Sequence, residues 1–310
     1  MNFFWGKIKN FFTEQPLPSS AIQVTSSSIS GVHLSSKERR LKHHFILPLS
    51  EKIIQPSLDR ANIKDAHQLM KNITERVEQF NIYRHAVALL LPELSQRTFV
   101  FAFDSLPKAL SEKEKIVRFK IKKQMPFLSD DVRISSDVIQ AEDGTKVISS
   151  VAHVSVVDDY EQFFSQMNVR IGAIGIPVLG LSNLIDWAEE KDFLLVNIEK
   201  DSFGLLAITN SEASLYRQKP LMAMYQDNLT ARVQNIVQEI ENTAHFIEDK
   251  EKRSIAAIWI RLGGFGLEEE MFSNLEKKLS FAVKSVHSLL KYELRDEEKM
   301  ILAPLLGQLQ

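Results

Sequence analysis

Four hydroxyl side chains follow one another near the start of the sequence, between two short apolar segments. They are Thr25, Ser26, Ser27 and Ser28. The pattern predicts a strand, a tight turn and a second strand over residues 21–34. A turn of this composition gathers backbone N–H groups and hydroxyls in one place, where they can hold a phosphate. The same pattern is also typical of an ordinary β-hairpin, and both interpretations stay open.

Two later segments contain residues whose types and spacing also fit phosphate binding. Residues 193–209 again predict strand, polar turn and strand, with Asn197 and Glu199 where the first strand ends. Residues 254–266 predict a buried strand that runs into Gly263 and Gly264, with Gly266 close behind. A glycine pair lets a backbone approach a ring or a phosphate closely, and it also occurs in simple turns. The two similar hairpins suggest two related lobes that face each other.

The composition excludes several classes of site. The 310 residues are 44% hydrophobic and 25% charged, which is typical of a globular protein of one large or two ordinary domains. A net charge of −2 does not point to nucleic acid. There is no cysteine, so disulfides, cysteine zinc sites and thiol nucleophiles are excluded. No apolar run reaches the roughly 18 residues that a membrane span needs.

An apolar arm is expected at residues 1–18. Its aromatic residues are Phe3, Phe4, Trp5, Phe11 and Phe12. Three of them precede the lysines and no small-residue cleavage site follows, which does not fit a signal peptide. Phe4, Ile8, Phe11 and Phe12 would share one side of a helix, which fits a short amphipathic helix. The arm either packs on its own domain or contacts a membrane surface or a partner, because so many exposed aromatic side chains are costly in water.

Helices and strands alternate along the rest of the chain. Strands are expected at 42–49, 86–91 and 97–105 and helices at 66–80 and 231–247, which together predict a mixed sheet with helices packed on it. A hairpin is expected at 132–154 and a helix at 158–167. A strongly charged helix precedes them and starts near residue 111. The basic residues of this charged helix form either a solvated face or a surface that touches phosphates or acidic lipid; they are Lys115, Arg118, Lys122 and Lys123.

A series of short motifs between residues 101 and 160 resembles the PilM family of type IV pilus assembly proteins. The motifs are Phe103-Asp104-Ser105-Leu106-Pro107, the charged helix with Arg118, Met125-Pro126-Phe127, Asp130-Asp131-Val132 and Val156-Val157-Asp158-Asp159-Tyr160. The resemblance extends from about residue 20 to the end of the chain.

The resemblance implies an α/β, two-lobed actin-like (ribonuclease H-like) fold with a small α+β subdomain inserted in the first lobe. It places the first lobe at 19–96 plus 169–190, the inserted subdomain at 97–168 and the second lobe at 191–310. The final helix, over residues 300–309, is expected to return to the first lobe, with Pro304 distorting it.

The same resemblance makes 21–34 and 193–209 the two phosphate hairpins, and here the chain departs from the family. Gln23 and Asn197 stand where carboxylates facing Mg²⁺ are expected, and Thr25 and Glu199 stand where the backbone wraps the phosphates. Ser30 replaces a lysine. A carboxylate in a phosphate turn repels the nucleotide by about 1 kcal/mol or more. We therefore expect a degenerate nucleotide cleft with no catalytic residue, no metal and no cofactor, in which binding of ATP and Mg²⁺ is lost or weak.

The function that the resemblance implies is a non-enzymatic cytoplasmic scaffold, peripheral on the inner membrane through its partners. The partners would be the N-terminal peptide of a PilN-like membrane protein, other pilus platform or motor proteins, and a second copy of the chain, with no nucleic acid. Two alternatives stay open. One is an ATP-binding actin-like protein whose nucleotide state gates assembly, and the other is the cytoplasmic domain of a GspL-like type II secretion protein.

Overall fold

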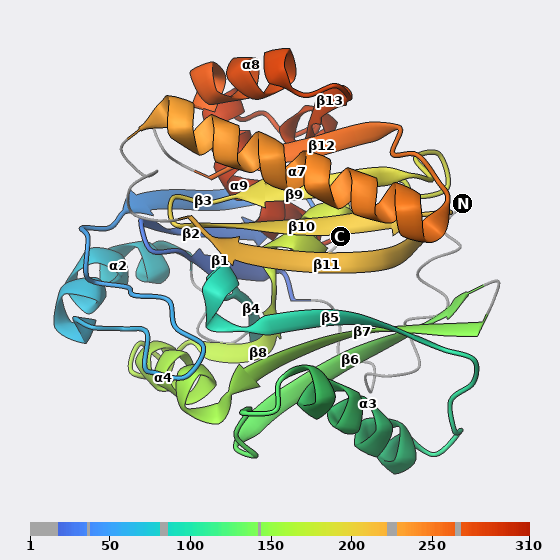
Figure 1. Ribbon diagram of the computed structural model, residues 1–310. Helices are drawn as coiled ribbons and strands as arrows, with labels where there is room; N and C mark the ends of the chain where they lie inside the picture. The colour runs from blue at the N-terminus through green and yellow to red at the C-terminus, as the bar shows by residue number, and fades with distance from the viewer. Residues whose placement is uncertain (1–17, 36–37, 81–85, 142–143, 222–227, 264–267) are drawn as a thin grey trace.

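The computed structural model describes residues 18–35, 38–80, 86–141, 144–221, 228–263 and 268–310. Three β-sheets with helices packed on them make up this part of the chain (Figure 1). None of the helices in these ranges is long and apolar enough to cross a membrane.

The first sheet has the strand order β3-β2-β1-β4-β8. Its strands are β1 (Ser20–Val24), β2 (Ser28–Leu34), β3 (Leu41–Pro48), β4 (Ala86–Leu90) and β8 (Arg170–Gly175). β1, β2 and β3 pair in antiparallel fashion, whereas β4 pairs in parallel with both β1 and β8. The helices α2 (Ala66–Phe80) and α4 (Val154–Ser165) share a hydrophobic core with this sheet. We call this assembly the first lobe.

The second sheet repeats that order and pairing as β11-β10-β9-β12-β13. Its strands are β9 (Phe193–Ile198), β10 (Ser202–Thr209), β11 (Glu212–Pro220), β12 (Ala257–Leu262) and β13 (Ala282–Ser285). The helices α7 (Leu229–Glu251) and α8 (Glu268–Lys278) cover its outer face (Figure 1). We call this assembly the second lobe.

A smaller three-stranded sheet, β5-β7-β6, lies in the lower part of Figure 1, below β1, β2 and β3. It consists of β5 (Arg97–Phe103), β6 (Val132–Ala141) and β7 (Gly144–His153), with α3 (Leu110–Gln124) packed on it. The expected boundary of the inserted subdomain includes α4, yet the buried face of α4, with Val156, Tyr160 and Phe164, belongs to the core of the first lobe.

The lobes meet around a shared core that includes two further helices. These are α5 (Pro177–Ser182) and α9 (Asp296–Gln308), and the single turns η1 (Glu93–Ser95) and η2 (Val286–Leu289) lie on the connections. α9 packs against α5, β1 and β2 of the first lobe and against β12 of the second.

The crossing of α5 and α9 brings two backbones together. A Cβ atom added to Gly307 would lie 2.0 Å from the carbonyl oxygen of Gly180, and one added to Gly180 would lie 2.4 Å from the carbonyl oxygen of Pro304. No side-chain rotation could relieve either contact, because the atoms that the added Cβ would meet belong to the backbone. Only glycine therefore allows this approach.

We expect Gly307→Ala to lower the free energy of unfolding by about 1–3 kcal/mol, measured by urea denaturation, because the two helices must move apart. The same substitution in an ordinary helix interior stabilises by about 1 kcal/mol. A variant as stable as the parent, or more so, would contradict the close crossing.

Candidate functional site

The hydroxyl turn between β1 and β2 closes on itself. The Thr25 hydroxyl accepts the backbone N–H of Ser27 at 3.2 Å and that of Ser28 at 2.9 Å, and the N–H of Thr25 reaches the carbonyl of Ser28 at 2.9 Å. Three donors that a phosphate would need are thus already bonded within the turn. Ser26 completes the turn and is half-buried.

A buried cluster of five polar side chains lies where the two lobes meet. We call it the lobe-interface cluster: Gln23, Glu93, Asn197, Glu199 and Arg261. Each has no more than 4% of its surface exposed. The cluster unites three predicted site residues with two that were not predicted from the sequence, Glu93 and Arg261.

Arg261 on β12 is the centre of this cluster. Its Nη1 forms an ion pair with the Glu199 carboxylate and donates to Oδ1 of Asn197 at 3.0 Å. Its other nitrogens donate to two backbone carbonyls of α9, Nε to Met300 at 2.8 Å and Nη2 to Ile301 at 2.9 Å. The guanidinium therefore joins the hairpin of β9 and β10, the predicted second phosphate hairpin, to α9.

Pro304 explains why a carbonyl of α9 is free to accept. In a regular helix the carbonyl of Met300 would bond to the N–H of residue 304, but proline has no N–H. Arg261 supplies the missing donor. α9 continues through Pro304 to Gln308, because Arg261 on β12 satisfies the carbonyl that the proline leaves without a donor.

Several hydrogen bonds in this region cross from one lobe to the other. Gln23 on β1 donates from Nε2 to Glu199 at 3.1 Å, and Asn197 on β9 donates from Nδ2 to Glu93 at 3.3 Å. Gln218 on β11 donates to the backbone carbonyl of Glu93 at 2.7 Å. The amides that replace the expected carboxylates therefore tie the two lobes together.

Burial sets the charge of the two carboxyl groups. It raises the pKa of Glu93 to about 8; the hydrogen bond from Asn197 opposes this rise, and the Glu199 charge adds to it. Burial also raises the pKa of Glu199, while Arg261 lowers it. At neutral pH Glu93 thus keeps its proton, and its Oε1 has no hydrogen-bond partner among the described residues.

The first residue of the predicted glycine pair lies against the ion pair. A Cβ atom on Gly263 would be 2.2 Å from Oε2 of Glu199 and 2.5 Å from Nη1 of Arg261. Gly263 thus leaves room for the protein's own charged side chains. Gly264 and Gly266 lie outside the described residues, as do the arm residues Phe3, Phe4, Trp5, Phe11 and Phe12.

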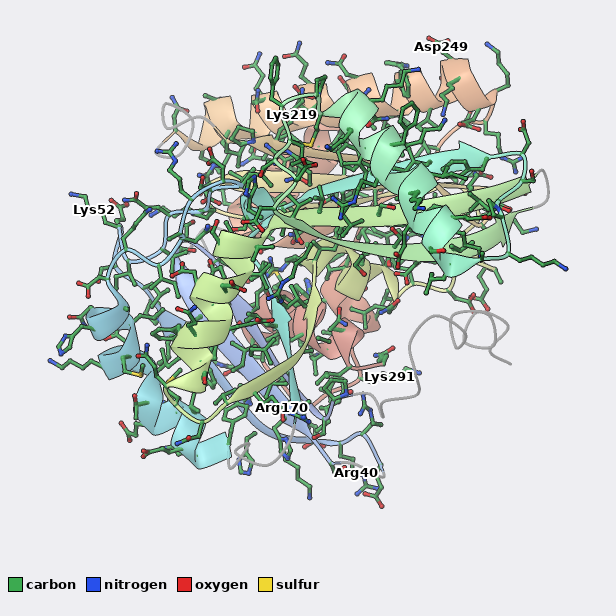
Figure 2. The ribbon with its side chains drawn as sticks, turned by 90° about the horizontal axis from the view of Figure 1, so that it is seen from below. Arg40, Lys52, Arg170, Lys219, Asp249 and Lys291 are labelled. Atoms are coloured by element: carbon green, nitrogen blue, oxygen red, sulfur yellow. The ribbon has the colours of Figure 1, made fainter. Side chains whose placement is uncertain are left out.

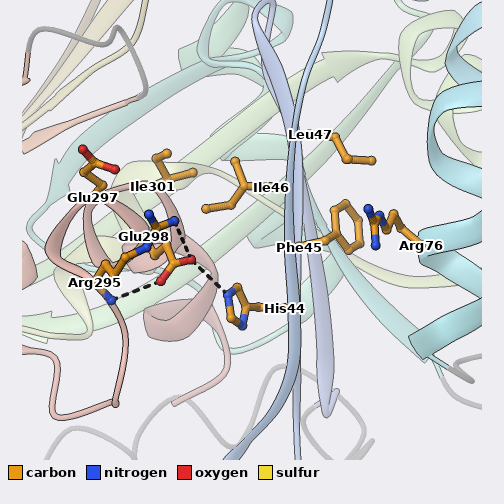
Figure 3. Close-up of a pocket in the computed structure, with 9 residues that line it drawn as sticks. All are labelled: His44, Phe45, Ile46, Leu47, Arg76, Arg295, Glu297, Glu298 and Ile301. Atoms are coloured by element: carbon orange, nitrogen blue, oxygen red, sulfur yellow. Dashed lines mark hydrogen bonds and ion pairs between the residues drawn. The ribbon is translucent and has the colours of Figure 1, made fainter.

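A separate pocket of about 440 Å³ opens at β3, the edge strand of the first lobe (Figure 3). His44 and Ile46 point to one side of β3, toward α9, whereas Phe45 and Leu47 point to the other side. Oε1 of Glu298 lies 3.0 Å from Nη2 of Arg295 and 3.6 Å from Nε2 of His44, so this carboxylate contacts both side chains. This arrangement offers no nucleophile activated by a base.

No protein-family model and no curated protein matches the sequence. Solved structures do match. A chain of a PilM–PilN type IV pilus biogenesis complex is 16% identical over 95% of this chain and 98% of that chain, with a TM-score of 0.77. A protein of Bacteroides thetaiotaomicron with an actin-like ATPase fold and unknown function is 9% identical over 94% of this chain and 98% of that one, with a TM-score of 0.52.

The cytoplasmic domain of EpsL, an inner membrane component of the type II secretion system of Vibrio cholerae, is 7% identical over 92% of this chain and 94% of its own length, with a TM-score of 0.51. These similarities show an actin-like fold. The predicted fold class is therefore confirmed, and the predicted resemblance to PilM is confirmed at the level of the fold.

Proposed function

We propose that this protein is a non-enzymatic cytoplasmic scaffold in the inner-membrane assembly platform of a type IV pilus or a related secretion system. It binds a short N-terminal peptide of a PilN-like membrane partner. The observation that carries the proposal is the similarity, over nearly the whole chain, to a component of a PilM–PilN complex. The weaker similarity to the EpsL domain supports the same kind of role beside an inner membrane.

The lobe-interface cluster supports the non-enzymatic part of the proposal. Mg²⁺ prefers carboxylate and water oxygens, yet amides of Gln23 and Asn197 occupy the expected carboxylate positions. The carboxylate of Glu199 is already paired with Arg261, and the turn at Thr25 already uses its own N–H groups. A nucleotide would have to break these buried contacts before it gained any of its own.

The proposal is tested by calorimetric titration of the purified chain with two ligands. A synthetic N-terminal peptide of the PilN-like protein from the same organism should bind, and its scrambled version should not. MgATP should give no heat up to millimolar concentration. The combined variant Gln23→Asp, Asn197→Asp and Glu199→Gly should bind MgATP, because it restores the carboxylates and removes the repelling charge.

Each ligand tests one half of the proposal. Micromolar binding of MgATP by the parent chain would contradict the loss of nucleotide binding and favour a nucleotide-gated assembly factor. A peptide that binds no better than its scrambled control would contradict the scaffold function, whatever the result with nucleotide.

A further inference from the structure

The outer side of α3 carries an unusual concentration of exposed aromatic surface. Four large hydrophobic side chains of the described residues stand out as exposed, and three of them, Leu110, Phe119 and Phe127, lie within 18 residues on or next to this helix. Phe119 is 70% exposed, and Phe127, just beyond the end of α3, is 100% exposed. The opposite side of α3 packs on the small sheet through Val117 and Ile121, so the aromatic side faces away from the protein.

Lysines surround this aromatic surface. Residues three and four apart are neighbours on a helix, and Lys115 precedes Phe119 by four positions whereas Lys122 and Lys123 follow it by three and four. α3 contains six basic and two acidic residues in a chain whose net charge is −2. Positive charge is therefore gathered locally.

Two of these lysines make no ion pair within the described residues. Lys122 pairs with Asp130, but neither Lys115 nor Lys123 has an acidic partner there. The acidic residue of α3 that lies on the same side of the helix as Lys115 and Phe119 is Glu112, three positions before Lys115. We use "the α3 face" for Lys115, Phe119, Lys123 and Phe127 together.

A solvated helix needs charged side chains but gains nothing from exposed phenylalanines. An anionic bilayer accommodates both: aromatic rings enter the boundary between headgroups and acyl chains, and lysines contact lipid phosphates. We propose that the α3 face binds the surface of a membrane that contains anionic phospholipid. The proposal rests on α3 and the loop after it, and not on the proposed peptide partner.

Vesicle flotation of the full-length chain tests the proposal. It should bind vesicles of equimolar phosphatidylcholine and phosphatidylglycerol but not pure phosphatidylcholine, and high salt should weaken the binding. The double variant Lys115→Gln and Lys123→Gln should weaken it by about fivefold for each lysine. The matched control is Lys277→Gln with Lys278→Gln, which removes the same charge from exposed positions on α8, at the opposite end of the molecule (Figure 1).

Insertion of the aromatic side chains has its own readout. Because the chain has no cysteine, Phe127→Cys can be labelled with a polarity-sensitive fluorophore, and Asp249→Cys serves as control. Asp249 lies at the far end of α7 and points away from the molecule (Figure 2). With anionic vesicles the emission should shift to the blue and brighten at position 127 and stay unchanged at position 249.

Several results would overturn the proposal. The first is a chain that binds neither kind of vesicle. The second is binding that survives both the lysine changes and Phe119→Ser with Phe127→Ser, since it would then belong to another part of the chain, such as the N-terminal arm. The third is an equal loss in the α8 control, and the fourth is an unchanged emission at position 127.

Discussion

Replacing Arg261 with methionine should lower the free energy of unfolding by about 3–5 kcal/mol. The substitution leaves the Glu199 carboxylate buried without its cation and deprives two carbonyls of α9 of a donor. Breaking a buried ion pair by removing one partner is costly because the remaining charge has no water around it. Urea denaturation at neutral pH measures the loss.

Two further variants make this prediction specific. Arg170→Met removes an exposed arginine from the edge strand β8 (Figure 2) and should change stability by no more than about 0.5 kcal/mol. The double variant Arg261→Met with Glu199→Leu removes both charges and should be more stable than Arg261→Met alone, because no unpaired charge remains. If the double variant lost the sum of two independent single losses, the ion pair would not be the cause.

Glu93→Gln should remove a pH dependence from the stability of the protein. Between the usual carboxyl pKa near 4.3 and the raised value of about 8, the unfolded state has released the Glu93 proton while the folded state keeps it. The folded state then binds more protons, so the parent loses stability as the pH rises, by about 1.4 kcal/mol for each pH unit at most. Glutamine resembles the protonated acid and has no proton to lose.

The measurement compares parent and variant by urea denaturation between pH 5 and 8. Their stabilities should be similar near pH 5, and the variant should become progressively more stable than the parent toward pH 8. Glu112→Gln, at an exposed position on α3, should follow the parent at every pH. Parallel pH profiles for Glu93→Gln and the parent would show that Glu93 is ionised in the folded protein.

Local patterns predicted most of the secondary structure. The apolar spacing of Leu69, Ile73 and Val77 predicted α2 with the bounds that the structure has, because the buried stripe alone determines that helix. α9 starts at Asp296, four residues before the expected start. The apolar pattern begins only at Met300, whereas the acidic residues before it interact favourably with a helix N-terminus.

The site was predicted only in part, because its contacts join distant parts of the chain. The resemblance to the PilM family, applied to the two hairpins, led to Gln23, Asn197 and Glu199, and the structure brings all three together. Arg261 was missed, although a charged residue inside an otherwise apolar strand was a usable signal. Glu93 gave no such signal, since its burial depends on how β9 and β11 of the other lobe approach it.

The contacts of α9 also have a consequence for the order of events during synthesis on the ribosome. The core of the first lobe contains no residue of α9, whereas the core of the second lobe includes Met300. α9 emerges after α5, β1, β2 and β12, all of which it contacts. Until then Arg261 lacks its two carbonyl acceptors and Gly180 faces no partner helix. The shared core between the two lobes is therefore completed only once α9 has been synthesised.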